Sequence, residues 1–186
     1  MSELKTITMQ QLQKQGGKIA KYQQSYIVSQ LLLMYGLTTV HDCTYGEGRF
    51  YVLCRDALQF LSAGDIRVLN WLVKPDIFIP KPVWKQLDVL RCLNAHYEVV
   101  VVDPPFSPWN RGAEKRKHYL PSEGLGTPTR IIRSAINIAS ELCADYLLLH
   151  YNKYDTFKLK LVDGVEYIYT LYGHTNKSYF LLLELL

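Results

Sequence analysis

The chain has 186 residues, 48% of them hydrophobic and 20% charged, which is the composition of an ordinary globular protein with one core. We expect a single domain over residues 1–186, located in the cytoplasm, because no apolar run is long enough to cross a bilayer and the first residues lack a secretory signal. Four cysteines without a CxxC pair predict no metal site, and a formal net charge of +4 permits a polyanionic partner without requiring one.

The N-terminal half alternates helical and strand-like patterns. Residues 1–36 are an N-terminal segment of helical composition, and apolar residues follow helical spacing from Tyr22 until Gly36 stops the helix. The later elements of this half are expected to be, in chain order, a strand at 37–41, a helix at 50–61, a second strand at 66–70, a third strand at 76–79 and a helix at 82–95.

The C-terminal half contains the clearest strand. Residues 97–102 are continuous, apolar and β-branched, as in a buried parallel strand. Residues 156–162 fit either a strand or a short helix. The other elements are expected to be a helix at 127–143, a strand at 146–150 and a hairpin around the polar turn at 173–177. Strands that alternate with helices predict an α/β fold with a mostly parallel sheet and helices on both faces.

A glycine-containing turn, DCTYGEGRF at 42–50, joins the first strand to the helix expected after it. Gly46 and Gly48 let the backbone turn tightly and approach a ligand, and the helix N-terminus offers free N–H groups. Asp42 ends the strand, where its carboxylate can accept hydrogen bonds from a ligand's amine or hydroxyls. The turn is a candidate ligand site, although it lacks the GxGxxG spacing of dinucleotide folds.

A second motif, Asp103-Pro104-Pro105-Phe106, directly follows the strand at 97–102. It places a carboxylate and an aromatic ring at the carboxyl end of a central strand, where open α/β sheets form their ligand sites. The two prolines stiffen the turn and fix its carbonyl acceptors. The motif is therefore a candidate catalytic site.

In this order, the two motifs resemble those of class I S-adenosylmethionine-dependent methyltransferases, and among these the amino-methyltransferases of adenine N6, cytosine N4 and guanine N2. That family has an acidic-x-x-x-Gly-x-Gly turn after its first strand and an (Asp/Asn/Ser)-Pro-Pro-(Tyr/Phe/Trp) motif after its fourth. The resemblance extends loosely from Tyr22 to the C-terminus. It implies a Rossmann-like methyltransferase sheet, mostly parallel with an antiparallel C-terminal strand, which the predicted hairpin fits.

The resemblance implies S-adenosylmethionine as the cofactor, bound across the strand ends. The implied contacts are Asp42, Tyr45, Gly46, Gly48 and Tyr22. The family's acidic residue at the end of the second strand, which holds the ribose hydroxyls, corresponds to Asn70, or to Asp76 if the strand is shifted. Asn70 departs from the family pattern, because a neutral amide makes weaker hydrogen bonds than a carboxylate. Cys43-Thr44 also departs from it, since amino-methyltransferases often have Pro-Phe there.

The resemblance also implies how the reaction runs. The Asp103 carboxylate and the Pro104 carbonyl each accept a hydrogen bond from an exocyclic amino group, and Phe106 stacks on the base. Pro105 completes the catalytic motif. Orientation and preset acceptors supply most of the acceleration, and a target within a duplex must first be flipped out of the stack.

Residues 107–126 are expected to form a basic, substrate-facing loop. Between 109 and 119 it interleaves aromatic residues with four cations against one anion. Cations hold phosphates and rings stack on bases, so this composition favours a nucleic acid substrate. The expected substrate contacts are Trp109, Arg111, Lys115, Arg116 and Lys117. The motif does not choose between DNA and RNA, because a final Phe also occurs in RNA-modifying members.

Two alternatives stay open. One is an enzyme of the same fold that methylates a protein glutamine, although that class normally has Asn in place of Asp103. The other is a non-catalytic subunit that keeps the fold and binds a partner or nucleic acid. The chain is short for a separate recognition domain, so target recognition is assigned to the 107–126 loop, the N-terminal helices or a partner subunit.

Overall fold

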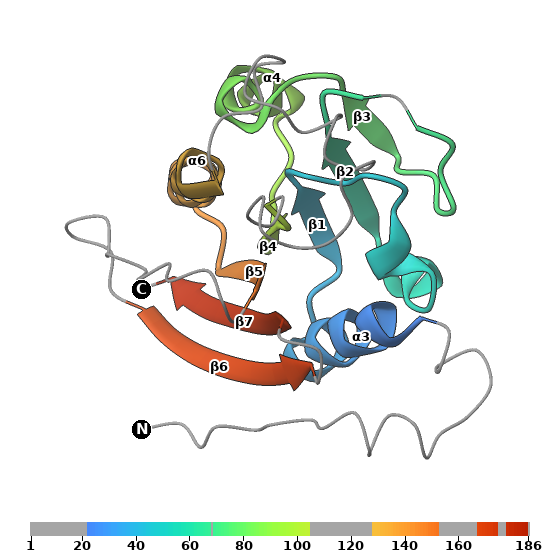
Figure 1. Ribbon diagram of the computed structural model, residues 1–186. Helices are drawn as coiled ribbons and strands as arrows, with labels where there is room; N and C mark the ends of the chain where they lie inside the picture. Colours follow the sequence, from blue (N-terminus) through green and yellow to red (C-terminus); the bar gives the residue numbers. More distant parts are fainter. Residues whose placement is uncertain (1–21, 68, 105–127, 153–166, 175–177, 186) are drawn as a thin grey trace.

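A seven-stranded sheet forms the centre of the computed structural model, which describes residues 22–67, 69–104, 128–152, 167–174 and 178–185. The strands are, in chain order, β1 (Thr39–Asp42), β2 (Phe60–Gly64), β3 (Ile77–Ile79), β4 (Val99–Val102), β5 (Tyr146–Asn152), β6 (Tyr167–His174) and β7 (Ser178–Leu185). Their order in the sheet is β3-β2-β1-β4-β5-β7-β6 (Figure 1). β1 to β5 are parallel, and β7 is antiparallel to both of its neighbours. The predicted mostly parallel sheet with an antiparallel C-terminal strand is confirmed.

Helices cover both faces of the sheet, as predicted (Figure 1). One face carries α3 (Gln23–Tyr35) and two short 3₁₀ helices, η1 (Arg49–Tyr51) and η2 (Arg55–Ala57). The other face carries the 3₁₀ helix η3 (Val83–Lys85), α4 (Leu87–Leu93) and α6 (Pro128–Glu141). Among the described residues, no helix has the length and apolar character needed to cross a membrane.

The four valines of β4 are all fully buried, because this strand lies between β1 and β5 and both of its faces are covered. Alternate side chains feed the two apolar clusters. Val99 and Val101 pack with α3 and η1, whereas Val100 and Val102 pack with α4 and α6. This two-sided burial fixes the position of the residue that follows the strand.

The helix α3 ends at Gly36, as the sequence predicts. Gly36 has φ +67°, a left-handed conformation that glycine adopts without a steric cost. The apolar positions Ile27, Val28, Leu31 and Leu32 are buried against the sheet. The predicted helical part of the segment before residue 22 lies outside the described residues, as do residues 156–162.

The helix predicted at 50–61 is wrong. The chain instead makes successive 3₁₀ turns, in which Tyr51, Cys54 and Ala57 donate to carbonyls three residues earlier. β2 begins at Phe60, so the connection back along the sheet has few residues. A 3₁₀ helix rises ~2.0 Å per residue against ~1.5 Å for an α-helix, and it therefore covers this distance with a shorter chain.

The strand predicted at 66–70 is also wrong, because β2 lies at Phe60–Gly64. The sequence of β2, FLSAG, contains small residues with a low strand propensity. Residues 66–69 include β-branched side chains and have the higher strand propensity, so the strand was predicted there. Directly after β2, the Asp65 carboxylate accepts the N–H of Arg67 at 3.0 Å and bends the chain out of the sheet. The turn at Asp65 and the packing of the small residues thus place the second strand six residues earlier than the hydrophobic pattern predicts.

Candidate active site

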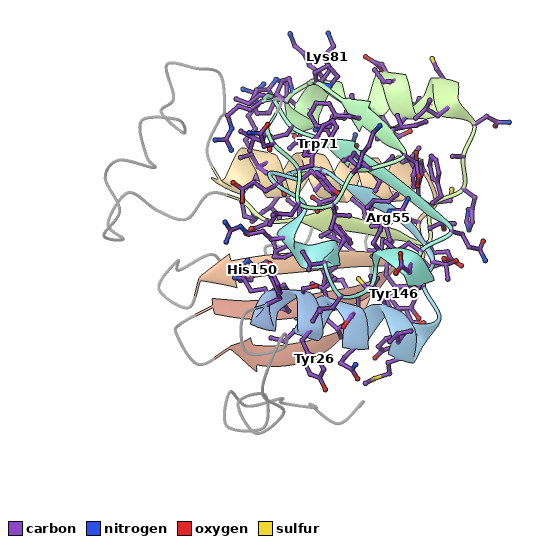
Figure 2. All side chains as sticks on the ribbon, turned by 90° about the vertical axis from the view of Figure 1, so that its right-hand side faces the viewer. Tyr26, Arg55, Trp71, Lys81, Tyr146 and His150 are labelled. Atoms are coloured by element: carbon purple, nitrogen blue, oxygen red, sulfur yellow. The ribbon has the colours of Figure 1, made fainter. Side chains whose placement is uncertain are left out.

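Three carboxylates stand where parallel strands end. Asp42 is the last residue of β1, Asp65 follows β2 and Asp103 follows β4. Because β1, β2 and β4 are parallel neighbours, these ends share one edge of the sheet. His150, on β5, lies at that edge too, and Figure 2 shows it at the opposite end of β5 from Tyr146. This edge is the candidate site.

Asp42 is buried and receives two short hydrogen bonds. Its Oδ1 accepts the N–H of Thr44 at 2.9 Å, and its Oδ2 accepts the hydroxyl of Tyr51 at 2.8 Å. Its pKa is nevertheless raised from 3.8 to about 7, mainly because burial disfavours the charged form; the two donors lower the pKa, and the nearby carboxylates of Asp103 and Asp65 add smaller raising effects. A buried carboxylate of this kind is poised to receive a positively charged group.

The turn at 43–48 is closed by its own contacts. Gly46 and Gly48 have φ values of +57° and +75°, which explains why glycine is needed at both. Tyr45 does not face outward, because its hydroxyl donates to the Val73 carbonyl at 2.8 Å and its ring stacks on Tyr51. A Cβ at Gly48 would lie 2.6 Å from the Tyr45 hydroxyl, whereas one at Gly46 would meet none of the described residues within 4 Å. The described part of the chain therefore leaves open space beside Gly46.

Asp65 occupies the end of the second strand, where the sequence suggested Asn70 or Asp76. Its Oδ2 accepts the N–H of Gly46 at 3.0 Å, which ties the end of β2 to the glycine turn. Asn70 is exposed in the connection between β2 and β3, so its placement at a strand end is wrong.

Asp76 belongs to the opposite end of β2. Its carboxylate accepts the N–H of Leu61 at 2.8 Å and pairs with Arg55 at 2.6 Å. Arg55 lies toward the Tyr146 end of the sheet and away from His150 (Figure 2). The structure therefore brings Asp65, and not Asp76, to the candidate site.

Asp103 is held at two points. Its backbone N–H donates to the Thr44 hydroxyl at 2.6 Å, and its Oδ1 lies 2.9 Å from Nδ1 of His150. The Asp103 side chain keeps 34% of its surface exposed, while that of His150 keeps 2%. Thr44 also contacts Asp42, so one residue links the two sequence motifs.

The buried Gln86 side chain holds the start of the glycine turn. The Gln86 amide donates to the Cys43 carbonyl at 3.0 Å, and its oxygen accepts Nε2–H of His41 at 3.0 Å. Nδ1 of His41 then accepts the Ser62 hydroxyl at 2.7 Å. Burial lowers the pKa of His41 from 6.5 to about 4, so this histidine is neutral. A Cβ at Gly64 would collide with the Gln86 amide, which accounts for glycine there.

Several predicted site residues are not placed. Pro104 is buried directly after Asp103, but Pro105, Phe106 and the whole 107–126 loop, with Trp109, Arg111, Lys115, Arg116 and Lys117, lie outside the described residues. Tyr22 precedes α3, and its carbonyl accepts the N–H of Tyr26 at 3.0 Å. The described part of the chain holds no group of three His, Cys, Asp or Glu residues that could bind a metal ion.

No family model and no curated protein matches the sequence, but solved structures match the fold. Magnesium protoporphyrin IX methyltransferase from Synechocystis PCC 6803, with bound SAM, aligns at a TM-score of 0.51 and 16% identity over 89% of this chain and 79% of that one. The SAM-dependent methyltransferase NGO1261 from Neisseria gonorrhoeae aligns at 0.54 and 13% over 86% and 66%. The chain has a Rossmann-like methyltransferase fold. SMU.1697c from Streptococcus mutans, a candidate methyltransferase in complex with SAH, aligns at 0.50 and 13% over 88% and 95%.

Within this methyltransferase fold, sequence reasoning missed three residues of the site: Thr44, Asp65 and His150. Asp65 was hidden by the misplaced second strand. Thr44 was noted only as a departure from Pro-Phe, and its hydroxyl turns out to hold Asp103. His150 belongs to neither motif, but a histidine near the end of the strand that is parallel to β4 was a usable signal.

Proposed function

We propose that the protein is a SAM-dependent N-methyltransferase that acts on an exocyclic amino group of a base in DNA or RNA. The observation that carries the proposal is the Asp103 carboxylate, part exposed directly after β4 and fixed at the edge of the sheet that also carries Asp42 and Asp65. The methyltransferase fold supports the cofactor, and the Asp-Pro-Pro-Phe sequence supports the amine.

The residues at the strand ends fit a ligand that carries positive charge and hydroxyl groups. Asp42 and Asp65 supply carboxylates, and the open space beside Gly46 leaves room for the ligand to approach the backbone. Asp65 already accepts two backbone N–H groups, and its Oδ1 pairs with Arg67 at 3.6 Å, but Oδ2 has a second lone pair for a ribose hydroxyl. We assign the cofactor to Asp42, Asp65 and the turn at 43–48.

The chain's own residues would prepare the amine. When bound, SAM supplies a methyl group on a positively charged sulfur, which the amine nitrogen takes with its lone pair as the carbon–sulfur bond breaks and its electrons stay on sulfur. Asp103 and the Pro104 carbonyl accept N–H bonds and orient the nitrogen, which is otherwise a poor nucleophile. After transfer the nitrogen carries one proton too many, and the Asp103 carboxylate is the acceptor beside it before the proton passes to solvent.

The polymer would be held mainly by the 107–126 loop, with a partner subunit as a further source of target recognition. Lys115, Arg116 and Lys117 are three consecutive cations that suit phosphates. Replacing all three by Glu should weaken binding to nucleic acid and flatten its dependence on salt, as measured by fluorescence anisotropy at several ionic strengths. Unchanged affinity and salt slope would remove the loop from the substrate site.

The test uses SAM labelled in its methyl group, a pool of synthetic DNA and RNA, and the full chain. Asp103→Ala removes the side-chain acceptor, and Asp88→Ala, on the exposed surface of α4, is the matched control. We expect label in nucleic acid for the wild type and Asp88→Ala, loss of transfer for Asp103→Ala, and removal of the label by one nuclease only. Label that resists both nucleases and stays with protein would overturn the proposal in favour of a protein amide substrate. A protein that binds SAM but transfers no label would need a partner subunit, and one that binds no SAM would be non-catalytic.

A further inference from the structure

His150 is the side chain in contact with the Asp103 carboxylate. Its Nδ1 lies 2.9 Å from Oδ1, within the range of a hydrogen bond to an ionised acceptor. An ionised carboxylate can only accept, so Nδ1 of His150 carries the hydrogen. The bond joins the ends of two adjacent parallel strands, β4 and β5.

The surroundings of His150 fix the direction of its ring. The imidazole stacks on Phe180 of β7, with ring centres 4.3 Å apart and planes 17° apart, and Phe50 of η1 meets it edge-on at 5.7 Å. Only 2% of the His150 side chain is exposed. A ring clamped between aromatic groups from two other elements cannot turn away from Asp103 without opening the core.

The bond from His150 makes the two carboxylate oxygens of Asp103 different, because it engages only Oδ1. His150 engages Oδ1, the backbone of Asp103 is anchored by Thr44, and 34% of the Asp103 side chain stays exposed. Both the main chain and the side chain of Asp103 are therefore restrained, and none of the described residues donates to Oδ2, which keeps its lone pairs for another donor. A preset acceptor lowers the reorganisation needed when charge develops on the amine.

We propose that His150 is a positioning residue for methyl transfer: it holds Oδ1 of Asp103 through Nδ1–H, so that Oδ2 is presented to the substrate amine. This inference rests on the proposed function, because it assigns His150 a part in that reaction. His150 touches neither the amine nor the cofactor in this scheme. It acts only through the orientation of Asp103.

The hydrogen bond itself can be tested without any reaction. Long-range ¹H–¹⁵N spectra of histidine-labelled protein report which ring nitrogen carries hydrogen, and the His150→Asn spectrum identifies the signals of His150 among the five histidines. We expect hydrogen on Nδ1 in the wild type and a shift toward the Nε2–H form in Asp103→Ala. An Nδ1 without hydrogen in the wild type would overturn the inference, and so would His150 ring signals that are unchanged by Asp103→Ala.

The role in turnover is tested with two variants. His150→Phe keeps a ring to stack on Phe180 and removes the donor, whereas His150→Asn keeps an N–H close to the position of Nδ1. With labelled SAM and the DNA and RNA pool, His150→Phe should lower kcat by about 10- to 100-fold, the scale of a hydrogen bond to a charged group. The Kd for SAM, measured by calorimetry, should not change, and His150→Asn should recover much of kcat.

The two proposals fail in different ways. Methyl transfer by the wild type, with the same kcat in His150→Phe, would overturn the role of His150 and leave the proposed function standing. Equal losses in His150→Phe and His150→Asn, with a weaker Kd for SAM, would show a structural role and also overturn it. A wild type that transfers no methyl group to nucleic acid would overturn the proposed function, and the role of His150 with it.

Discussion

Replacing Asp42 by asparagine removes a buried ionisable group while keeping the shape of the side chain. Burial raises the pKa of Asp42 from 3.8 to about 7, so between these values the native protein holds a proton that the unfolded chain has released. The free energy of unfolding therefore falls as the pH rises through this window. A shift of this size corresponds to about 4 kcal/mol in all, because each pKa unit is worth about 1.4 kcal/mol.

His41 has the opposite effect and hides part of this fall. Burial lowers the pKa of His41 from 6.5 to about 4, so in that range the unfolded chain binds a proton that the native protein does not. Its contribution to the free energy of unfolding rises with pH by about 3 kcal/mol. Between pH 4 and 6.5 the two groups oppose each other in the wild type. In Asp42→Asn only the contribution of His41 remains of these two, so the free energy of unfolding should rise with pH in this range.

The measurable quantity is the difference between variant and wild type, followed from pH 4 to pH 8 by urea unfolding and circular dichroism. Lost packing or hydrogen bonds shift this difference by a constant, whereas the ionisable group makes it grow by about 4 kcal/mol in favour of Asp42→Asn. Tyr51→Phe is the control, because it removes a donor that lowers the pKa of Asp42 and should extend the fall to higher pH. A difference that does not change with pH would refute the conclusion that burial dominates at Asp42.

Three further predictions concern the turn and its neighbours. Gly48→Ala should lower the free energy of unfolding by about 1–3 kcal/mol through backbone strain alone, and further through the clash with Tyr45, whereas Gly46→Ala suffers only the strain; equal losses on urea unfolding would contradict this. Thr44→Val leaves the N–H of Asp103 without its acceptor and should cost about 1–3 kcal/mol, while Thr44→Ser should behave as the wild type in the same assay. Asp65→Asn should weaken SAM binding about tenfold or more, as expected for loss of a charged acceptor, and Asp76→Asn should not; calorimetry that ranks them the other way would return the ribose to Asp76.

The sequence predicted most of the architecture, because its strongest signals are long or buried. The valines of β4, the helix α3 with its glycine stop and the terminal hairpin carry periodic patterns that local rules capture. The prediction of β2 failed because tertiary packing requires its small residues. At Gly64 a side chain would collide with Gln86, which lies 22 residues later in the chain. The prediction of a helix at 50–61 failed because the length of this segment depends on where β2 begins, which no local pattern reveals.

The same distinction holds for the site. Asp42, Gly46, Gly48 and Asp103 are found from motifs, since a motif fixes residue type and spacing together. His150 depends on the pairing of β4 with β5, and Asp65 depends on the correct end of β2. Both positions depend on how the strands pair and where they end, which local sequence patterns do not reveal.

The short η1 changes what kind of ligand this edge of the sheet can select. Folds that grip a pyrophosphate there use a long helix, whose first turn offers unpaired N–H groups and a partial positive charge. Here a three-residue 3₁₀ turn stands in that place, and the N–H groups of Gly46 and Gly48 are taken by Asp65 and by the Tyr45 carbonyl. With the N–H groups of Gly46 and Gly48 already engaged, this edge offers a polyphosphate such as ATP or NAD no donor at the turn, and the carboxyl groups of Asp42, Asp65 and Asp103 along it favour a ligand that donates hydrogen bonds through hydroxyl or amino groups.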